Sequence, residues 1–349
     1  MLNSRALVFA AVFILVLVAC GSATAPGTVV PVTVTSSSAT PIMISATAYG
    51  PEPTTLPVTR DSTTTADSRN YPASRPARVD DFLYQLQGID LTAIGSTAYD
   101  LVIIDYSADG SESGAFSRRE ISGLKNSVGG SKIVLAYMSI GEVEDYRFYW
   151  RADWDDSSPS WLSEENLNWA GNYKVRYWVP EWRSIIFRYV DSLLEAGFDG
   201  AYLDIIDAYE FFDDQGRDTA AQDMADFVAA IADHARASDP GFLIFPQNAP
   251  QLAALAPEYL DIVNGIGQEE IYFGYQADGD ATPADVTAEM ERYLDLFTDA
   301  GKLVLTVDYT SDVENVDLAY SRAWAKGYVP LATVRDLDRL TVNEGHRLD

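Results

Sequence analysis

The stretch FDGAYLDI, residues 198–205, is a short apolar run with an aspartate near its end, and Gly197 stands directly before it. Residues 182–194 place apolar side chains three and four positions apart, which is the spacing of an amphipathic helix. A short run rich in aromatic and aliphatic side chains that follows a glycine is typical of a buried strand. Together they predict a helix that leads into a parallel strand, the repeating unit of an α/β fold.

The same alternation continues along the chain on both sides of this stretch. Further amphipathic segments at 224–231 and 286–297 lie between short apolar runs. Eight strands are predicted, at residues 82–87, 101–106, 133–140, 198–205, 242–247, 262–269, 303–309 and 328–334. Eight strands with helices between them predict an α/β protein with a single (β/α)8 TIM barrel over residues 79–349. An open doubly wound sheet is the alternative, and the chain lacks the G-x-G-x-x-G turn typical of that fold.

Polar side chains stand at the ends of six consecutive predicted strands. Barrel enzymes build their active sites there, where the strands end and the following loops begin. In chain order these residues are Asp105, Glu142, Asp204, Asp207, Gln247, Asn248, Glu269, Glu270, Asp308 and Tyr309. Asp and Asn also cap helices in ordinary loops, so any one of them could be structural. Six strands in a row nevertheless predict a polar cleft.

The residue types restrict the chemistry of this cleft. The chain has 2 histidines and 1 cysteine, which argues against Ser-His-Asp triads, cysteine nucleophiles and histidine-based metal sites. Paired carboxylates suit a glycosidase, which needs an acid and a nucleophile or base but no cofactor or metal. All but one of the 7 tryptophans lie at residues 150–182, in an insertion after the third strand. Their rings could stack on sugars or pack a local core.

Several segments resemble glycoside hydrolase family 114, the endo-α-1,4-polygalactosaminidase family. The most specific is LAYMSIGEVEDYR at 135–147, and the others are FLYQLQ at 82–87, DLVIID at 100–105, GFDGAYLD at 197–204, PQN at 246–248 and GQEEIYF at 267–273. The resemblance implies a (β/α)8 barrel that cleaves polymers of α-1,4-linked galactosamine internally, with Asp204 and Glu269 as its catalytic pair. It implies cleft positions for Asp105, Tyr137, Glu142, Gln247, Asn248 and Asp308, and we add Asp207, Glu270 and Tyr309 as substrate-binding candidates.

The alternation of side chains along a strand bears on these assignments, because every second residue faces the barrel axis. In the fourth run it places Tyr202 and Asp204 on the axis side. In the seventh run we expect Asp308 to share that side with Thr306.

In the sixth run the alternation does not decide between Glu269 and Glu270, and the resemblance favours Glu269. We expect one of Asp204 and Glu269 to protonate the leaving oxygen while the other attacks the anomeric carbon or activates a water. The sequence leaves the two roles unassigned. A non-catalytic sugar-binding lipoprotein with the same aromatic loop and cleft is the alternative.

The first residues predict export. Arg5 is followed by the uncharged, mostly apolar residues 6–19, a run too short to span a bilayer, and LVAC at 17–20 resembles the bacterial lipobox. We expect a signal peptide at 1–19, a lipid on Cys20 and a disordered Ser/Thr/Pro-rich linker at 20–78. The barrel would then stand outside the cell, anchored at the outer face of its membrane.

The charge balance restricts the partners. With 52 acidic and 24 basic side chains the net charge is −28, which argues against nucleic acid as a partner. A polysaccharide that carries amino groups would suit an acidic cleft, although adaptation to salt produces the same bias. We expect a monomer that meets the membrane only through its N-terminal lipid.

Overall fold

The computed structural model describes residues 79–154 and 158–346, so the predicted signal peptide, Cys20 and linker lie outside the described residues. All eight predicted runs form strands. These are β1 (Phe82–Gln85), β2 (Leu101–Asp105), β5 (Ile133–Ser139), β9 (Gly200–Asp204), β10 (Leu243–Pro246), β11 (Gly265–Glu269), β12 (Leu303–Tyr309) and β13 (Val329–Thr333).

The eight strands follow one another in chain order around a barrel. One parallel sheet has the order β1-β2-β5-β9-β10 and a second has the order β11-β12-β13. Gln247 and Gly267 form a single parallel bridge where β10 meets β11. At the other junction β13 lies beside β1, and the amides of Leu86 and Gln87 donate to the Leu337 carbonyl. The strand order confirms the predicted barrel and excludes the doubly wound sheet.

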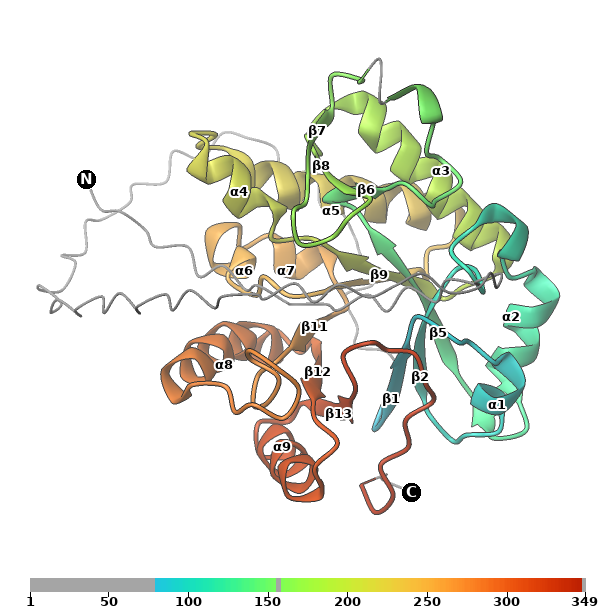
Figure 1. Ribbon diagram of the computed structural model, residues 1–349, viewed down its shortest axis with the longest axis vertical. Coiled ribbons are helices and arrows are strands. Elements are labelled where there is room, and N and C mark those ends of the chain that lie inside the picture. Colours follow the sequence, from blue (N-terminus) through green and yellow to red (C-terminus); the bar gives the residue numbers. More distant parts are fainter. Residues whose placement is uncertain (1–78, 155–157, 347–349) are drawn as a thin grey trace, which may run out of the picture. The chain divides into compact units, whose positions relative to one another are not determined.

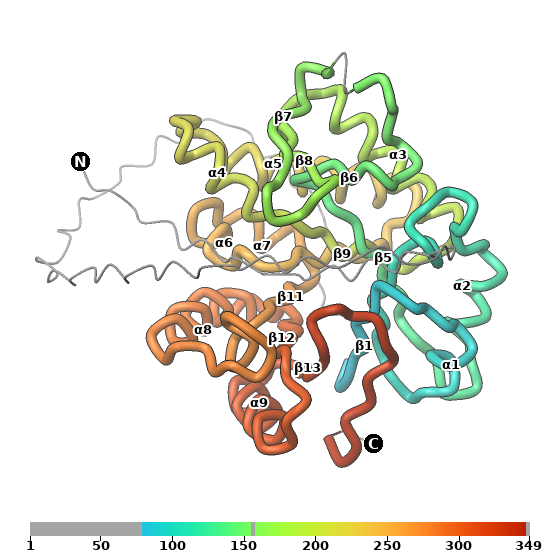
Figure 2. The backbone as a smooth tube through the Cα atoms, in the orientation of Figure 1, coloured from blue at the N-terminus to red at the C-terminus, as the bar shows by residue number. Residues whose placement is uncertain are grey.

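Helices surround the strands (Figure 1), and Figure 2 shows the backbone path through the barrel. They are α1 (Leu91–Gly95), α2 (Arg118–Lys125), α3 (Pro180–Ala196), α4 (Ala208–Asp214), α5 (Ala220–Ser238), α6 (Leu252–Leu255), α7 (Tyr259–Ile262), α8 (Ala284–Asp299) and α9 (Val313–Ala325). The helices α3, α5 and α8 contain the three predicted amphipathic segments. Pro180 occupies the first turn of α3, and Gly197 ends it in the left-handed conformation that favours glycine.

Aromatic and aliphatic side chains fill the barrel interior. Tyr202 belongs to this interior cluster, whereas Ala201 and Leu203 pack toward the helices, as the alternation predicted. The prediction for the seventh strand was wrong, because Leu305, Val307 and Tyr309 face inward and Asp308 therefore faces the helix layer. The strand is buried on both faces, and its polar residues Thr306 and Asp308 lie on the helix side, so they do not mark the inner face.

Two glycines on β11 make room for this interior packing. A Cβ added at Gly267 would lie 1.8 Å from the Tyr202 hydroxyl, and one added at Gly265 would lie 2.2 Å from the ring of Phe245. Neither neighbour could accommodate a methyl group at such distances. The glycines therefore allow aromatic rings from β9 and β10 to reach across the barrel below the strand ends.

The insertion between β5 and α3 has a small sheet of its own. It consists of β6 (Glu142–Glu144), β7 (Leu162–Glu165) and β8 (Asn172–Val175) in the antiparallel order β6-β8-β7. A short 3-10 helix spans Ala152–Trp154, another spans Glu112–Gly114, and a minor hairpin joins Asn126–Ser127 to Gly130–Ser131. The sheet begins directly after the third barrel strand and so borders its carboxyl end.

Candidate active site

Asp204 ends β9, and its carboxylate has two hydrogen-bond donors. The Tyr137 hydroxyl donates to Oδ2 at 2.6 Å, and the Ile205 amide donates to Oδ1 at 2.8 Å. Tyr137 belongs to β5, the strand that pairs with β9. Neighbouring barrel strands therefore fix the orientation of the Asp204 carboxyl group.

Glu269 ends β11, and donors contact both of its carboxylate oxygens. Gln247 Nε2 lies 2.7 Å and Asn248 Nδ2 lies 2.8 Å from Oε2, and the Tyr309 hydroxyl donates to Oε1. The Tyr84 hydroxyl in turn donates to Gln247 Oε1 at 2.9 Å, so the amide must turn its NH2 group toward Glu269. Side chains from β1 and β12 and from the end of β10 thus hold one carboxylate.

The environment of Asp204 raises its pKa well above that of an ordinary aspartate. Burial and the negative charge of Glu269 raise the pKa of Asp204 from 3.8 to about 8, although the hydrogen bonds from Tyr137 and Ile205 lower it. Asp204 therefore keeps a proton at neutral pH more readily than an ordinary aspartate does, which suits a group that gives or receives a proton in catalysis.

The backbone turns sharply directly after three of the strands that carry these groups. Ile205, Asn248, Ala249 and Glu270 have φ angles of 58, 61, 52 and 58. This left-handed region costs a non-glycine residue about 1 kcal/mol or more, and it is especially unfavourable for a β-branched side chain. Such strain is typical of sites where side-chain direction matters.

Asp105 ends β2 and is engaged in a buried ion pair. Arg147 Nη1 lies 2.7 Å from Asp105 Oδ2, and Arg147 Nε lies 2.7 Å from Glu144 Oε2. Burial raises the pKa of Asp105 to about 6 against the opposing effect of Arg147. The Arg147 guanidinium lies 6.0 Å from the Tyr137 ring, so Asp105 borders the site through this arginine.

Two further predicted residues lie beside the insertion sheet. Glu142 accepts from Asn166 Nδ2 at 2.9 Å and lies 3.4 Å from Lys174 Nζ. Asp207 is exposed after β9, and charge interactions couple it to Lys174 and Glu210. Both carboxylates therefore border the same end of the barrel as Asp204.

Asp308 does not face the cleft. Its Oδ1 accepts from the amides of Tyr272 at 2.6 Å and Phe273 at 2.8 Å, which lie in the loop after β11. The side chain is 1% exposed, and burial raises its pKa to about 7. The expected cleft position is therefore corrected: Asp308 holds a loop on the helix side, and Tyr309 occupies the inner position.

Arg335 is the site-region residue that the sequence reasoning missed. It pairs with Glu270, donates to the Gly274 carbonyl and lies 3.2 Å from Asp278, while its guanidinium stands over the Tyr309 ring. Glu270 is thus engaged with an arginine beside Glu269. The available signal was its place directly after the eighth predicted strand, the same position that drew attention to the other candidates.

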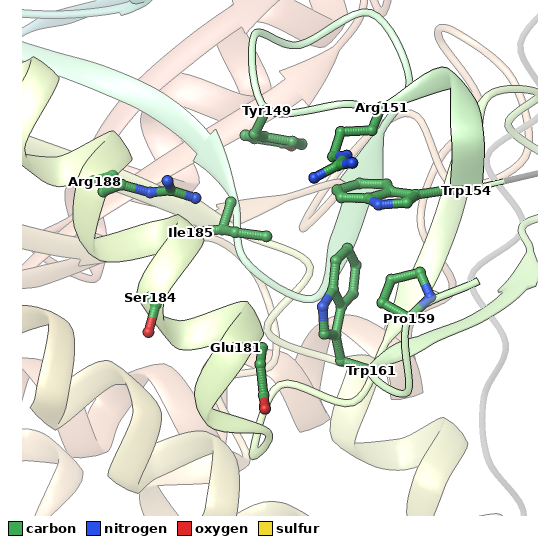
Figure 3. Close-up of a pocket in the computed structure, with 9 residues that line it drawn as sticks. All are labelled: Tyr149, Arg151, Trp154, Pro159, Trp161, Glu181, Ser184, Ile185 and Arg188. Carbon is green, nitrogen blue, oxygen red and sulfur yellow. The ribbon is translucent and has the colours of Figure 1, made fainter. Parts of the chain in front are cut away.

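A cavity of about 570 Å³ lies in the insertion against α3 (Figure 3). Trp154 and Trp161 line it with their ring centroids 4.9 Å apart, and Trp161 lies 5.0 Å from Trp182. These three rings are buried and pack a local core, which is one of the two expected roles. Neither Asp204 nor Glu269 lines this cavity.

Across 79–154 and 158–346, no group of three or more His, Cys, Asp or Glu side chains is arranged to hold a metal ion. The helices of the same segments are too short or too polar to cross a membrane.

The sequence was also compared with known proteins. A sequence model described as glycoside-hydrolase family GH114 matches residues 62–347. An uncharacterized protein of Methanocaldococcus jannaschii is 38% identical over 271 residues, which cover 74% of this chain and 77% of that protein. An uncharacterized protein of Thermotoga maritima is 38% identical over 279 residues, which cover 76% of this chain and 84% of that protein.

Two solved structures share the fold. The glycoside hydrolase domain of PelA from Pseudomonas aeruginosa has a TM-score of 0.60 and 19% identity, covering 76% of this chain and 98% of that domain. Aspergillus fumigatus Ega3, solved in complex with galactosamine, has a TM-score of 0.58 and 20% identity, covering 77% of this chain and 97% of that one. At these identities the likeness concerns the barrel fold.

Proposed function

Because the chain belongs to glycoside hydrolase family GH114, we propose that it cleaves an aminosugar polysaccharide with Asp204 and Glu269 as its catalytic carboxyl groups. The observation that carries the proposal is this pair at the ends of β9 and β11, with each carboxyl group held by hydrogen bonds. Glycosidic hydrolysis needs an acid and a nucleophile or base in this arrangement and no cofactor.

In the proposed reaction one carboxyl group protonates the leaving glycosidic oxygen. The other attacks the anomeric carbon or removes a proton from a water that attacks it. The hydrogen bonds from Gln247, Asn248 and Tyr309 keep the Glu269 carboxylate in place without a metal ion. NMR observation of the first-formed anomer distinguishes retention from inversion and thereby shows whether one of the two carboxylates acts as a nucleophile or activates a water.

The acidity of the cleft supports an aminosugar polymer as the substrate. Glu142, Asp207 and Glu210 add negative charge beside the catalytic pair, and the whole chain carries −28. Cationic amino groups would be attracted to such a field. The solved complex of Ega3 with galactosamine concerns a protein of the same fold and supports this choice. We propose internal cleavage of an α-1,4-linked galactosamine polymer.

The test is depolymerisation of galactosamine polysaccharides, acetylated and free, with detection of new reducing ends. Asp204→Asn and Glu269→Gln should each lower the rate by at least about a thousandfold, because each removes a group that acts in the transition state. Asp299→Asn, at the exposed end of α8, is the matched control. If both site variants cleave at the wild-type rate, the assignment of the pair is wrong.

A non-catalytic role in glycan capture stays as the second candidate. It shares the acidic cleft, and it predicts binding of the polymer without any new reducing ends. Saturable binding by wild-type protein that cleaves none of the offered glycans would favour capture over hydrolysis.

We also propose that a lipid on Cys20 anchors the enzyme outside the cell, where a large polymer is met. The support is the sequence alone, since residue 20 lies outside the described residues. Cys20→Ala should move the full chain from the membrane fraction to the medium or the soluble exported fraction. An unchanged membrane fraction would contradict the anchor.

A further inference from the structure

We propose that Arg335 is a positioning residue for Glu269 and that it acts through the ring of Tyr309. The inference rests on the proposed function, because it concerns the same carboxyl pair. It extends that function to a residue after the eighth strand, β13, which contributes no member of the pair.

The Arg335 guanidinium is fixed on several sides. Its Nη1 pairs with the Glu270 carboxylate, its Nη2 donates to the Gly274 carbonyl, and its Nε lies 3.2 Å from Asp278. The side chains of Arg335 and Glu270 are each 11% exposed. Only a planar fork of donors can satisfy these acceptors at once, so the cation has one favoured orientation.

That orientation places the cation over Tyr309. The Arg335 Cζ atom lies 4.5 Å from the ring centroid, within the range of a cation–π contact. The ring is 3% exposed, and its hydroxyl donates to Glu269 Oε1. A cation over the ring draws electron density from the phenol and makes the hydroxyl a better donor. The contact therefore fixes both the place and the strength of one hydrogen bond to Glu269.

The Glu270 contact acts on the backbone directly after Glu269. Glu270 has the left-handed φ of 58, and its amide donates to the Val307 carbonyl at 2.8 Å. Its carboxylate is held by Arg335. Arg335 thus connects the loop after β13 to the strained turn after β11, across the intervening strand β12. This second connection holds the backbone directly after Glu269.

Several titratable groups lie around Arg335, Tyr309 and Glu269, and the interpretation of any pH titration must take them into account. From the elements packed around Glu269 and Tyr309 they are Tyr84 on β1, Tyr202 and Asp204 on β9, Asp207 after β9, and Glu270 and Asp278 after β11. A variant that keeps the positive charge of Arg335 leaves the electrostatic influence of the cation on these groups nearly constant.

The test is therefore a double-variant cycle of Arg335→Lys and Tyr309→Phe. Lysine keeps the charge but not the planar fork, so we expect kcat to fall about fivefold while KM changes less than about twofold. In the Tyr309→Phe background, Arg335→Lys should cause a smaller loss, because the connection through the ring is already cut and only the one through Glu270 is left. Arg339→Met, which removes a surface cation paired with Asp338, is the matched control and should keep the wild-type rate.

A second readout needs no substrate. A hydrogen-bonded phenol proton gives a downfield NMR signal, which Tyr309→Phe would remove and so assign. Arg335→Lys should shift or broaden that signal, and Arg339→Met should leave it unchanged. If the wild-type protein cleaves no glycan, the proposed function fails, and this signal still decides the role of Arg335.

Two results would overturn the inference. One is an Arg335→Lys protein with the wild-type kcat and an unmoved phenol signal. The other is an Arg335→Lys substitution that lowers kcat by the same factor with and without the Tyr309 hydroxyl. If Arg335→Lys does not fold, as judged by thermal melting, Glu270→Gln carries the same cycle, because it removes the charge that holds Arg335. Its loss of kcat must then also be smaller in the Tyr309→Phe background.

Discussion

Replacing Asp204 with Asn is expected to stabilise the folded protein at alkaline pH while it abolishes hydrolysis. Folding raises the pKa of Asp204 from 3.8 to about 8, so the folded state keeps a proton that the unfolded state releases. The free energy of unfolding of the wild type therefore falls as pH rises from about 4 to about 8. Asparagine does not titrate and removes this loss.

The magnitude follows from the size of the pKa change. One pKa unit corresponds to about 1.4 kcal/mol, so a fully enclosed group would account for several kcal/mol. Asp204 is only half-buried, and we therefore expect a gain of about 2 kcal/mol near pH 8 and almost none near pH 4. Asparagine suits the site, because its carbonyl can accept from Ile205 and its NH2 group can donate to the Tyr137 oxygen.

The assay is urea unfolding of the wild type and Asp204→Asn at several pH values between about 4 and about 8, with Asp299→Asn as the exposed control. The difference between Asp204→Asn and the wild type should grow with pH, and the control should show no such trend. A difference that is constant with pH, or an Asp204→Asn protein that is less stable than the wild type near pH 8, would refute the reasoning.

Three further perturbations follow from individual contacts. Tyr137→Phe removes the 2.6 Å donor to Asp204, so the pKa of Asp204 should rise and the alkaline limb of the kcat/KM–pH profile should move up by about one pH unit; a limb that stays in place contradicts this. Gly267→Ala places a methyl group against Tyr202 and should lower the free energy of unfolding by about 2 kcal/mol in denaturant titrations, with a native-like value as the contrary result. Asp308→Asn should leave KM unchanged, because this side chain faces the helix layer, whereas an altered KM at full stability would return this residue to the cleft.

The strands of the fold were predictable because each has a local signature. The length and the ends of a strand such as FDGAYLDI can be predicted from the apolar run itself. In the helix before it, the spacing of the apolar residues identifies the buried face. The family resemblance then pointed to Glu269 where alternation did not decide. The structure shows the physical basis of that ambiguity, since Gly265 and Gly267 share the inner face with Glu269 and carry no side chain to indicate it.

The contacts within the site were harder to predict from the sequence. The inner face of β12 was misassigned because the polar side chains of a strand buried on both sides need not face the cleft, and Asp308 instead accepts hydrogen bonds from the amides of a loop. Arg335 was missed because its partners Glu270 and Tyr309 are distant along the chain and meet it only after the barrel closes. Residue type and spacing predict a single helix or strand, whereas contacts such as those of Arg335 depend on the curvature of the sheet that brings several strands together.

The aromatic packing beneath the strand ends limits the access of solvent to the proposed catalytic pair. Tyr84, Tyr202 and Phe245 are each 1% exposed or less, and the glycines of β11 let them fill the barrel directly below Asp204 and Glu269. Within the described barrel, proton exchange between the pair and bulk water is therefore confined to the end of the barrel where the strands stop. On the proposed function a bound polymer would cover that end, so the pH of the surroundings would act on the free enzyme more than on the complex.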